Sequence, residues 1–144
     1  MILSRSSVYA IRLIFSLLEK QPLSRFLRIK DAALELDVPY FQLAKVANVM
    51  ISEKILTSST GPNGGIDLGP NVNDLTLQDI ITTFGDGDVF DSCILGLKEC
   101  SDESPCPIHS AWSSVKGEII DIFSNRTLGE LKKDEVLPII IKSK

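Results

Sequence analysis

Two short helical patterns separated by a tight turn constrain the fold of this chain most. Apolar residues recur at helical spacing on both sides of the turn, first at Ile29, Ala32, Ala33 and Leu36, then at Leu43, Val46, Ala47 and Met50. Between the two patterns, Pro39 disfavours helical backbone at Val38, while its own fixed φ angle suits the first turn of a new helix. Two short helices joined in this way are typical of a helix-turn-helix.

A β-hairpin is predicted directly after the second of these helices. Residues 55–59 have the pattern of a strand, residues 61–65 that of a turn, and residues 66–68 that of the returning strand. We expect Asn63 and Gly64 to supply the positive φ angles that a tight hairpin needs. A helix-turn-helix followed by a hairpin is a winged helix, in which the hairpin forms the wing.

Two further helices flank this unit. Apolar residues at helical spacing predict a helix over residues 4–20, which Pro22 ends. After the wing, Thr76 and Asp79 have the spacing of a capping box and predict a helix that ends near Phe84. Residues 127–131 begin with a second capping box and predict a short terminal helix.

From residue 108 onward, helical periodicity returns as a narrow apolar stripe, called the seam below. Its members are four and three residues apart in alternation: Ile108, Trp112, Val115, Ile119 and Ile122. The seam fits either the chain's own first helix or a second copy of the chain, and its narrow width favours the second copy. The predicted fold class is therefore mainly α with a small β-hairpin: a winged helix-turn-helix plus a long C-terminal dimerisation helix.

Charge is unevenly distributed along the chain. Residues 1–60 contain 8 Lys and Arg against 5 Asp and Glu, a net charge of +3, whereas residues 61–144 contain 7 against 14, a net charge of −7. The basic N-terminal part can present a face to phosphate, which makes nucleic acid a candidate partner. No stretch reaches the roughly 18 apolar residues of a membrane span, and the N-terminus lacks an export-signal pattern, so we expect a cytoplasmic protein without a membrane partner.

Residues 86–107 have no periodicity and contain all three cysteines. With the single histidine they give the spacing Cys-x6-Cys-x5-Cys-x2-His, at Cys93, Cys100, Cys106 and His109. Thiolates are the usual ligands of iron–sulfur clusters, and an imidazole can replace one of them. The same groups suit a structural zinc ion, although zinc ligands are usually spaced more closely. Exposed thiols beside a solvated histidine, or a catalytic Cys–His pair without an evident oxyanion pocket, are further alternatives that spacing alone leaves open.

Taken in order, these motifs resemble one family over almost the whole chain. The resemblance runs through residues 4–10, the helix-turn-helix over residues 38–56, the wing over residues 59–66, residues 77–81, the cysteine loop, His109 with Trp112, and residues 127–131. The family comprises the winged-helix transcription regulators of the IscR, NsrR and CymR types. It implies a DNA-binding regulator, neither an enzyme nor a protein with a small-molecule substrate.

The resemblance also implies partners and a cofactor. It implies a homodimer on a palindromic operator in double-stranded DNA, with the third helix in the major groove and the wing in the minor groove. The implied contacts come from Ser4, Arg5, Tyr40, Phe41, Gln42, Lys45, Ser59, Thr60, Gly61, Asn63 and Gly64. It further implies that Cys93, Cys100, Cys106 and His109 bind an iron–sulfur cluster that senses redox state, cluster supply or nitric oxide. Val8 stands where the 4Fe–4S type has a partner-protomer carboxylate, so 2Fe–2S is the first choice and 4Fe–4S the second.

The implied organisation is a DNA-binding winged helix in residues 1–84, a cluster-binding loop in residues 85–107, and a dimerisation helix with a C-terminal tail in residues 108–144. Several residues depart from the family pattern. The wing has Thr60 in place of an arginine and Ile66 in place of a tyrosine, and the third helix has Ala44 in place of a base-reading glutamate. Phe41, which replaces a serine, fits a base contact and a core position equally. The missing wing arginine and the acidic C-terminal part support one alternative, a zinc-stabilised or apo dimer that acts through protein contacts without sequence-specific DNA binding.

Overall fold

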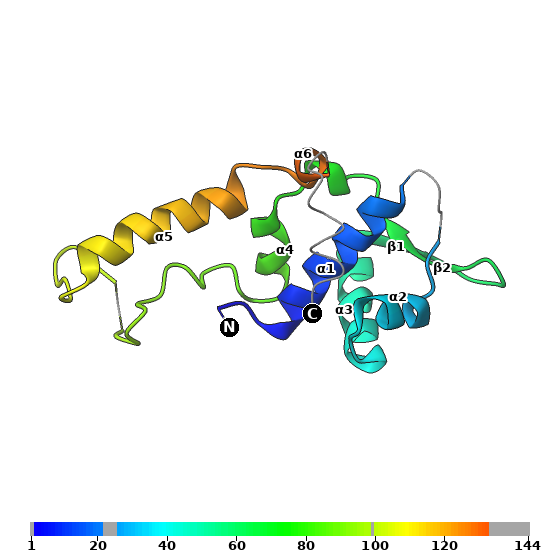
Figure 1. The fold of residues 1–144 in the computed structure, drawn as a ribbon, viewed down its shortest axis with the longest axis horizontal. Coiled ribbons are helices and arrows are strands. Elements are labelled where there is room, and N and C mark those ends of the chain that lie inside the picture. Colours follow the sequence, from blue (N-terminus) through cyan, green and yellow to red (C-terminus); the bar gives the residue numbers. More distant parts are fainter. Residues whose placement is uncertain (1, 22–25, 99, 133–144) are drawn as a thin grey trace.

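The computed structural model describes residues 2–21, 26–98 and 100–132 (Figure 1). Its helices and strands are α1 (Arg5–Lys20), α2 (Ile29–Leu36), α3 (Tyr40–Ser52), β1 (Leu56–Ser59), β2 (Gly65–Leu68), the 3-10 helix η1 (Val72–Asp74), α4 (Leu77–Thr83), α5 (His109–Ser124) and α6 (Leu128–Leu131). This order confirms the predicted fold class, mainly helical with one small hairpin. None of the helices in the described ranges is both long and apolar enough to cross a membrane.

Helix α1 lies at the centre of the hydrophobic core. Its apolar residues recur at helical spacing, and Leu13, Leu18 and Ala10 are fully buried. They belong to one cluster with Leu43 and Met50 of α3, which are buried equally well. The core therefore lies between α1 and the two helices of the helix-turn-helix, which leaves the outer face of α3 to solvent.

The turn between α2 and α3 has the sharp geometry that the sequence predicts. Asp37 ends α2 in the left-handed conformation, with φ 54°, and the N–H of Val38 donates to the carbonyl of Ala33 over 3.0 Å. Pro39 then precedes the first residue of α3 in extended backbone. Asp is one of the few residues that adopt this conformation at moderate cost. The turn fixes the angle at which α3 leaves α2.

The wing is a two-stranded antiparallel hairpin in which Ser59 pairs with Gly65. Five residues therefore lie between the paired ends. The prediction that Asn63 and Gly64 have positive φ angles is wrong, because positive φ occurs at Gly61 (97°) and Gly65 (146°). Gly64 is required for another reason: a Cβ there would lie 2.3 Å from the carbonyl oxygen of Ser59.

The C-terminal part of the described chain leaves the core along α5 and returns at α6. Figure 1 shows α5 extending away from the other helices, with the cysteine loop running below it. Thr127 caps α6 through the predicted capping box, and the N–H of Leu128 donates to the carbonyl oxygen of Leu75 over 2.7 Å. Leu128 itself is fully buried in the main core. Helix α5 is thereby held at its C-terminal end.

Candidate nucleic-acid interface and metal centre

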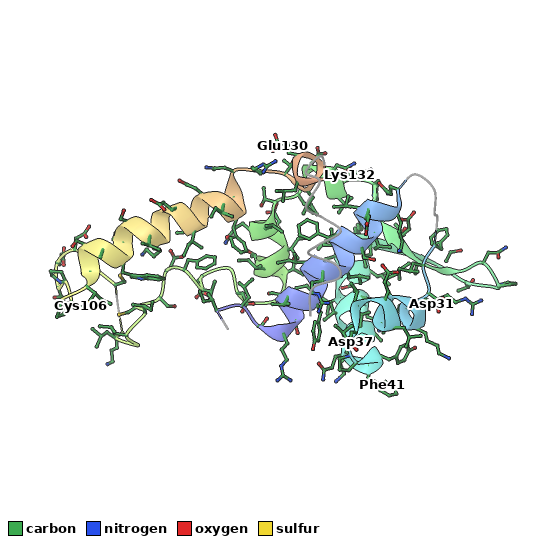
Figure 2. The ribbon with its side chains drawn as sticks, in the orientation of Figure 1. Asp31, Asp37, Phe41, Cys106, Glu130 and Lys132 are labelled. Carbon is green, nitrogen blue, oxygen red and sulfur yellow. The ribbon has the colours of Figure 1, made fainter. Side chains whose placement is uncertain are left out.

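The outer face of α3 presents aromatic side chains to solvent. Phe41 is 79% exposed and Tyr40 is 46% exposed, and their rings meet edge to face with centroids 5.3 Å apart. Figure 2 shows Phe41 at the outer edge of the helix-turn-helix, far from Cys106. The core alternative for Phe41 is therefore wrong. An exposed phenylalanine at the start of a recognition helix can contact the methyl group of thymine in the major groove.

On one side of α3, a hollow brings together three of the residues predicted to contact DNA. Arg5 from α1 lies there with Gln42 and Lys45 from α3. The helix-turn-helix topology produces this arrangement, since α1 crosses α3 in the core. Ser4 is instead engaged within the chain: its hydroxyl accepts from the N–H of Ser7 and donates to Asp86 over 2.7 Å.

On the other side of α3, a second hollow lies between α2, α3 and the wing. Ser59, Gly61 and Gly64 of the wing line it together with Tyr40, and Thr60 and Asn63 are exposed nearby in the wing. Sequence reasoning missed the other polar residues of this hollow, which are Arg28, Lys30, Asn48 and Ser58. Asn48 could have been found, because it lies within one helical turn of Lys45 on α3, although the two residues line different hollows. Arg28 and Lys30 belong to α2 or precede it, and only the fold brings them to the wing.

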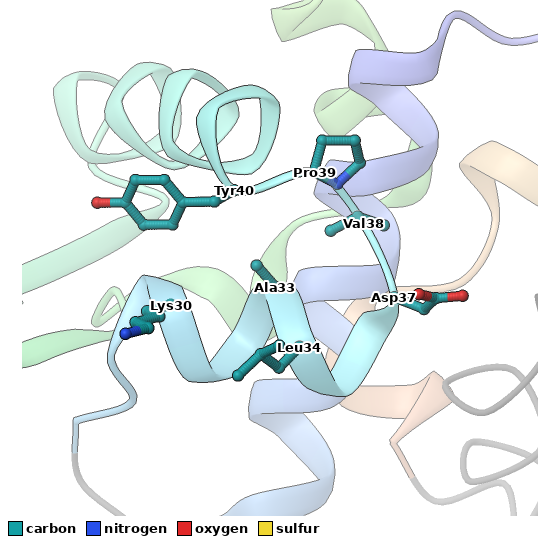
Figure 3. Close-up of a pocket in the computed structure, with 7 residues that line it drawn as sticks. All are labelled: Lys30, Ala33, Leu34, Asp37, Val38, Pro39 and Tyr40. Atoms are coloured by element: carbon teal, nitrogen blue, oxygen red, sulfur yellow. The ribbon is translucent and has the colours of Figure 1, made fainter.

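A third hollow lies within the helix-turn-helix itself, where α2 and α3 diverge from their turn. It is lined by Lys30, Ala33, Leu34, Asp37, Val38, Pro39 and Tyr40 (Figure 3). In Figure 3, the side chains of Lys30 and Tyr40 extend to the same side of this hollow. Its rim therefore adds a cation and a phenol hydroxyl to the surface beside the recognition helix.

The three cysteines lie in the long loop between α4 and α5, and none forms a disulfide. Cys93, Cys100 and Cys106 are all half-buried. The sulfur of Cys100 lies 3.6 Å from Nδ1 of His109, the first residue of α5. Across the described residues, no three side chains of the metal-ligating types are close enough to share an ion. The structure thus brings the side chains of Cys100 and His109 together, whereas the sulfurs of Cys93 and Cys106 do not join them in a group that could share an ion.

The Cys100–His109 pair has a separation suitable for two ligands of one metal ion. Metal–sulfur and metal–imidazole bonds of about 2.3 and 2.0 Å at tetrahedral angles place the two ligand atoms about 3.5 Å apart. The other ring nitrogen of His109, Nε2, lies 2.7 Å from a carboxylate oxygen of Asp102. Metal-bound imidazoles generally have such a partner, because it fixes the ring orientation and the tautomer. Three free thiols with this imidazole fit the donor set of an iron–sulfur cluster, and the sequence pattern did not reveal Asp102.

Helix α5 buries none of its residues in the chain. Three seam residues, Ile108, Val115 and Ile122, are 41, 48 and 62% exposed, while Trp112 and Ile119 are half-buried. The indole N–H of Trp112 is buried, and no residue in the described ranges accepts from it. An unsatisfied buried donor costs about 1–3 kcal/mol.

Near the C-terminal end of α5, an almost wholly apolar hollow collects side chains from three segments. It is lined by Ile2, Leu3, Val8, Phe90, Ile119, Ile122 and Phe123. The rings of Phe90 and Phe123 are in contact, with centroids 5.2 Å apart. The seam is therefore joined to a larger apolar surface that includes the start of the chain.

Asp86 connects the start of the cysteine loop to the start of α1. One of its carboxylate oxygens accepts from the backbone N–H of Ser4 and from the hydroxyls of Ser4 and Ser7. Burial raises the pKa of Asp86, but the hydrogen bonds from Ser7 and Ser4 outweigh that effect and lower the pKa below its ordinary value. Ser7 is fully buried, so this carboxylate satisfies a hydroxyl that water does not reach.

Comparison with known proteins agrees with this architecture. An HTH-type transcriptional regulator of Aquifex aeolicus is 31% identical over 109 residues, which cover 74% of this chain and 76% of that protein. The transcriptional regulator IscR of Vibrio campbellii is 33% identical over 86 residues, 59% of this chain and only 51% of that regulator. The match to IscR thus spans about half of that protein.

Solved structures share the fold at lower identity. CymR, the global cysteine regulator of B. subtilis, has a TM-score of 0.70 at 21% identity, over 90% of this chain and 95% of that one. T. potens IscR has a TM-score of 0.65 at 20% identity, over 92% of this chain and 86% of that one.

The sequence relatives are named as transcriptional regulators and not as enzymes. This confirms the expectations that the chain is a transcription regulator and that it is not an enzyme. Residues 3–134 match the family described as Rrf2, iron-dependent transcriptional regulator. That match covers most of the chain and confirms the resemblance seen in its motifs. The chain belongs to the Rrf2 family of DNA-binding transcriptional regulators.

Proposed function

We propose that this regulator is a homodimer that binds a palindromic operator and senses redox state, cluster supply or nitric oxide through an iron–sulfur cluster. The observation that carries the sensing part is the Cys100–His109 pair, with sulfur and nitrogen 3.6 Å apart at the point where the cysteine loop enters α5. Cys93 and Cys106, both free and half-buried in the same loop, complete the proposed ligand set.

Operator recognition is assigned to α3 and the wing. Phe41 and Gln42 face the base edges at the start of α3, while Arg5, Lys45 and Ser59 contact phosphates. This division is supported by the exposure of Phe41 and by the hollow that gathers Arg5, Gln42 and Lys45. Phosphate contacts position a protein on DNA, and contacts to base edges select the sequence.

A 2Fe–2S centre is the preferred cofactor. When bound, such a cluster supplies one-electron redox chemistry and reactivity toward nitric oxide. Val8 lies in an apolar hollow with Ile119 and Phe90 and offers no ligand atom. Asp102 holds the ring of His109 by its other nitrogen. Since His109 is the first residue of α5, any change in its position acts directly on the seam helix.

The exposure of α5 supports homodimerisation through this helix. None of its residues is fully buried in its own chain, and its exposed Val115 and Ile122 belong to one stripe. A second α5 packed along the seam would cover that stripe, as in a two-stranded coiled coil. Two winged helices would then face two half-sites of one operator.

The test is an absorption spectrum of protein purified and reconstituted without oxygen. Visible charge-transfer bands are expected, and Cys93→Ala, Cys100→Ala and Cys106→Ala should each abolish them, because each leaves an iron under-coordinated. Glu118→Ala, on the exposed surface of α5, serves as the matched control. A full cluster in the Cys100 variant would contradict the ligand set.

A colourless protein that contains zinc would favour the alternative, a zinc-stabilised dimer. Fluorescence anisotropy on fragments selected from random DNA separates the two accounts of DNA binding. If neither the cluster-loaded nor the cluster-free protein selects any sequence, the regulator must act through protein contacts.

A further inference from the structure

We propose that Arg28 supplies the cation that enters the minor groove beside the wing, in place of the arginine that the wing lacks. This inference rests on the proposed binding of the wing to DNA. The wing has Thr60 at the position where the family pattern has arginine. The structure places a different arginine, from the segment before α2, against the same turn.

Arg28 is attached to the wing by its side chain. Its guanidinium Nη2 donates to the carbonyl oxygen of Pro62, in the wing turn, over 2.6 Å. Arg28 is exposed to solvent. Of the five donors of a guanidinium, this bond uses one on the side facing the wing. The remaining donors of the planar group can face a ligand.

The backbone next to Arg28 is also fixed to the wing. Leu27 exchanges two hydrogen bonds of 2.8 Å with Ile66 of β2, so this segment forms an isolated antiparallel bridge with the wing. The approach is so close that a Cβ on Gly65 would lie 2.4 Å from the carbonyl oxygen of Leu27 and 2.9 Å from the nitrogen of Arg28. The backbone at Arg28 is therefore held directly against the wing.

Within the described residues, no ion pair neutralises the charge of Arg28, since the pairs there join Lys20 to Glu35 and His109 to Asp102. Lys30 lines the same hollow and adds a second positive charge. A narrow minor groove in A·T-rich DNA has an enhanced negative potential that attracts arginine in particular. An exposed guanidinium held at the wing turn matches that requirement, and a lysine offers no planar fork.

The test uses DNA in which only the minor groove changes. In fragments selected by the wild-type protein, A·T pairs in the segment flanking the half-site are replaced by G·C or by inosine·C. Guanine adds an N2 amino group to the minor groove, whereas inosine lacks it and otherwise presents the major-groove pattern of guanine. The wild-type homodimer should bind A·T and inosine·C flanks alike, and G·C flanks about tenfold more weakly, a typical cost for one mismatched contact.

Arg28→Ala should reduce that discrimination to within about twofold, and Arg28→Lys should restore it only in part. Lys30→Ala is the matched control: it should flatten the salt dependence but keep the tenfold preference, as expected for a phosphate contact. Adding Thr60→Arg to Arg28→Ala should restore the preference for A·T and inosine·C flanks. That rescue also shows that the Arg28→Ala protein is folded.

Three results would overturn the proposal. Arg28→Ala could weaken binding to all three flanks equally, which would make Arg28 a phosphate contact only, or it could leave binding unchanged. The third is a wild-type protein that selects a sequence but binds inosine·C and G·C flanks equally, which refutes the inference about Arg28 and not the proposed regulator function. If the wild-type protein selects no DNA at all, both the proposed regulator function and the inference about Arg28 fail.

Discussion

At the scale of single residues, Phe41 is the side chain on which operator preference should depend most. It is 79% exposed at the start of the recognition helix, and its ring is supported edge to face by Tyr40. Because a phenyl ring contacts thymine through the 5-methyl group, replacing that thymine by uracil should weaken wild-type binding about fourfold, the cost of one buried methyl group at roughly 0.8 kcal/mol. Phe41→Ser should bind both DNAs equally.

Anisotropy titrations on a selected fragment, with each thymine of one half-site replaced in turn, provide the measurement. Tyr40→Phe is the control variant, since it keeps both rings and removes only a hydroxyl. It should remain as sensitive to uracil as the wild-type protein. Equal sensitivity of Phe41→Ser and wild type at every position would show that Phe41 does not contact a thymine methyl group.

Residue chemistry explains which members of the candidate site the sequence could predict. Cys100 and His109 are rare residue types at short spacing, so their proximity could be expected without a structure. Arg28 and Asp102 are common surface types whose role depends on a single partner, Pro62 in one case and His109 in the other. The Arg28–Pro62 contact joins residues 34 apart, and no local pattern signals such a contact.

At the scale of elements, the seam of α5 should hold the dimer. Ile119 lies in the seam between Val115 and Ile122. In the structure Ile119 also lines the hollow with Val8 and Phe90, so a change there would disturb the chain's own packing. Val115→Glu is the better test, because Val115 is 48% exposed in the single chain and does not line this hollow. Ile122→Glu is the second test, since Ile122 also lines the hollow but is 62% exposed.

Each of these variants places an unpaired carboxylate in the proposed interface, which costs several kcal/mol when buried. Sedimentation at micromolar concentration should therefore detect monomers with unchanged far-UV circular dichroism. Ser114→Glu, exposed on the same helix and outside the seam, should remain dimeric. Dimers of the Val115 and Ile122 variants at that dilution would locate the interface elsewhere.

Most elements could be predicted because their signals are local. The capping boxes of α4 and α6 and the turn at Pro39 depend on residues within four positions of each other. The wing turn could not be predicted from the Asn63–Gly64 pair alone, since its geometry depends on register. Pairing of Ser59 with Gly65 leaves five residues between the strands, and the N–H of Gly64 donates to Gly61 over 3.0 Å. That bond makes Pro62 and Asn63 the central residues of a turn that needs no positive φ at either.

At the scale of the whole molecule, the candidate DNA-binding face and the cysteine loop lie at opposite ends, and Asp86 is one of the points where their segments meet. Figure 2 shows Phe41 and Cys106 far apart. Asp86 follows α4 and binds the start of α1, next to Arg5. The charge asymmetry of the sequence separates the same two parts, but only the structure identifies this connection.

Asp86→Asn should lower the free energy of unfolding near neutral pH by about 1 kcal/mol, which is below the usual range for hydrogen bonds to a charged group because solvent screens the half-exposed side chain. The pKa of Asp86 is lowered in the folded state by its bonds to Ser7 and Ser4. Its contribution is therefore complete above the unfolded-state pKa of about 3.9 and is lost as the pH falls through the folded-state value. The difference between wild type and variant should accordingly be constant from pH 7 to about pH 5 and shrink below about pH 4.

Urea unfolding followed by far-UV circular dichroism, at one fixed protein concentration because dimerisation contributes to stability, measures this difference across the pH range. Asp88→Asn is the matched control: Asp88 lies two residues further along the same loop and is exposed, so its substitution should change stability little at any pH. Ser7→Ala should destabilise the protein in the same pH window, because it removes one of the donors that lower the pKa of Asp86. A difference between wild type and Asp86→Asn that stayed constant down to pH 3 would mean that the ionised carboxylate does not secure the start of α1.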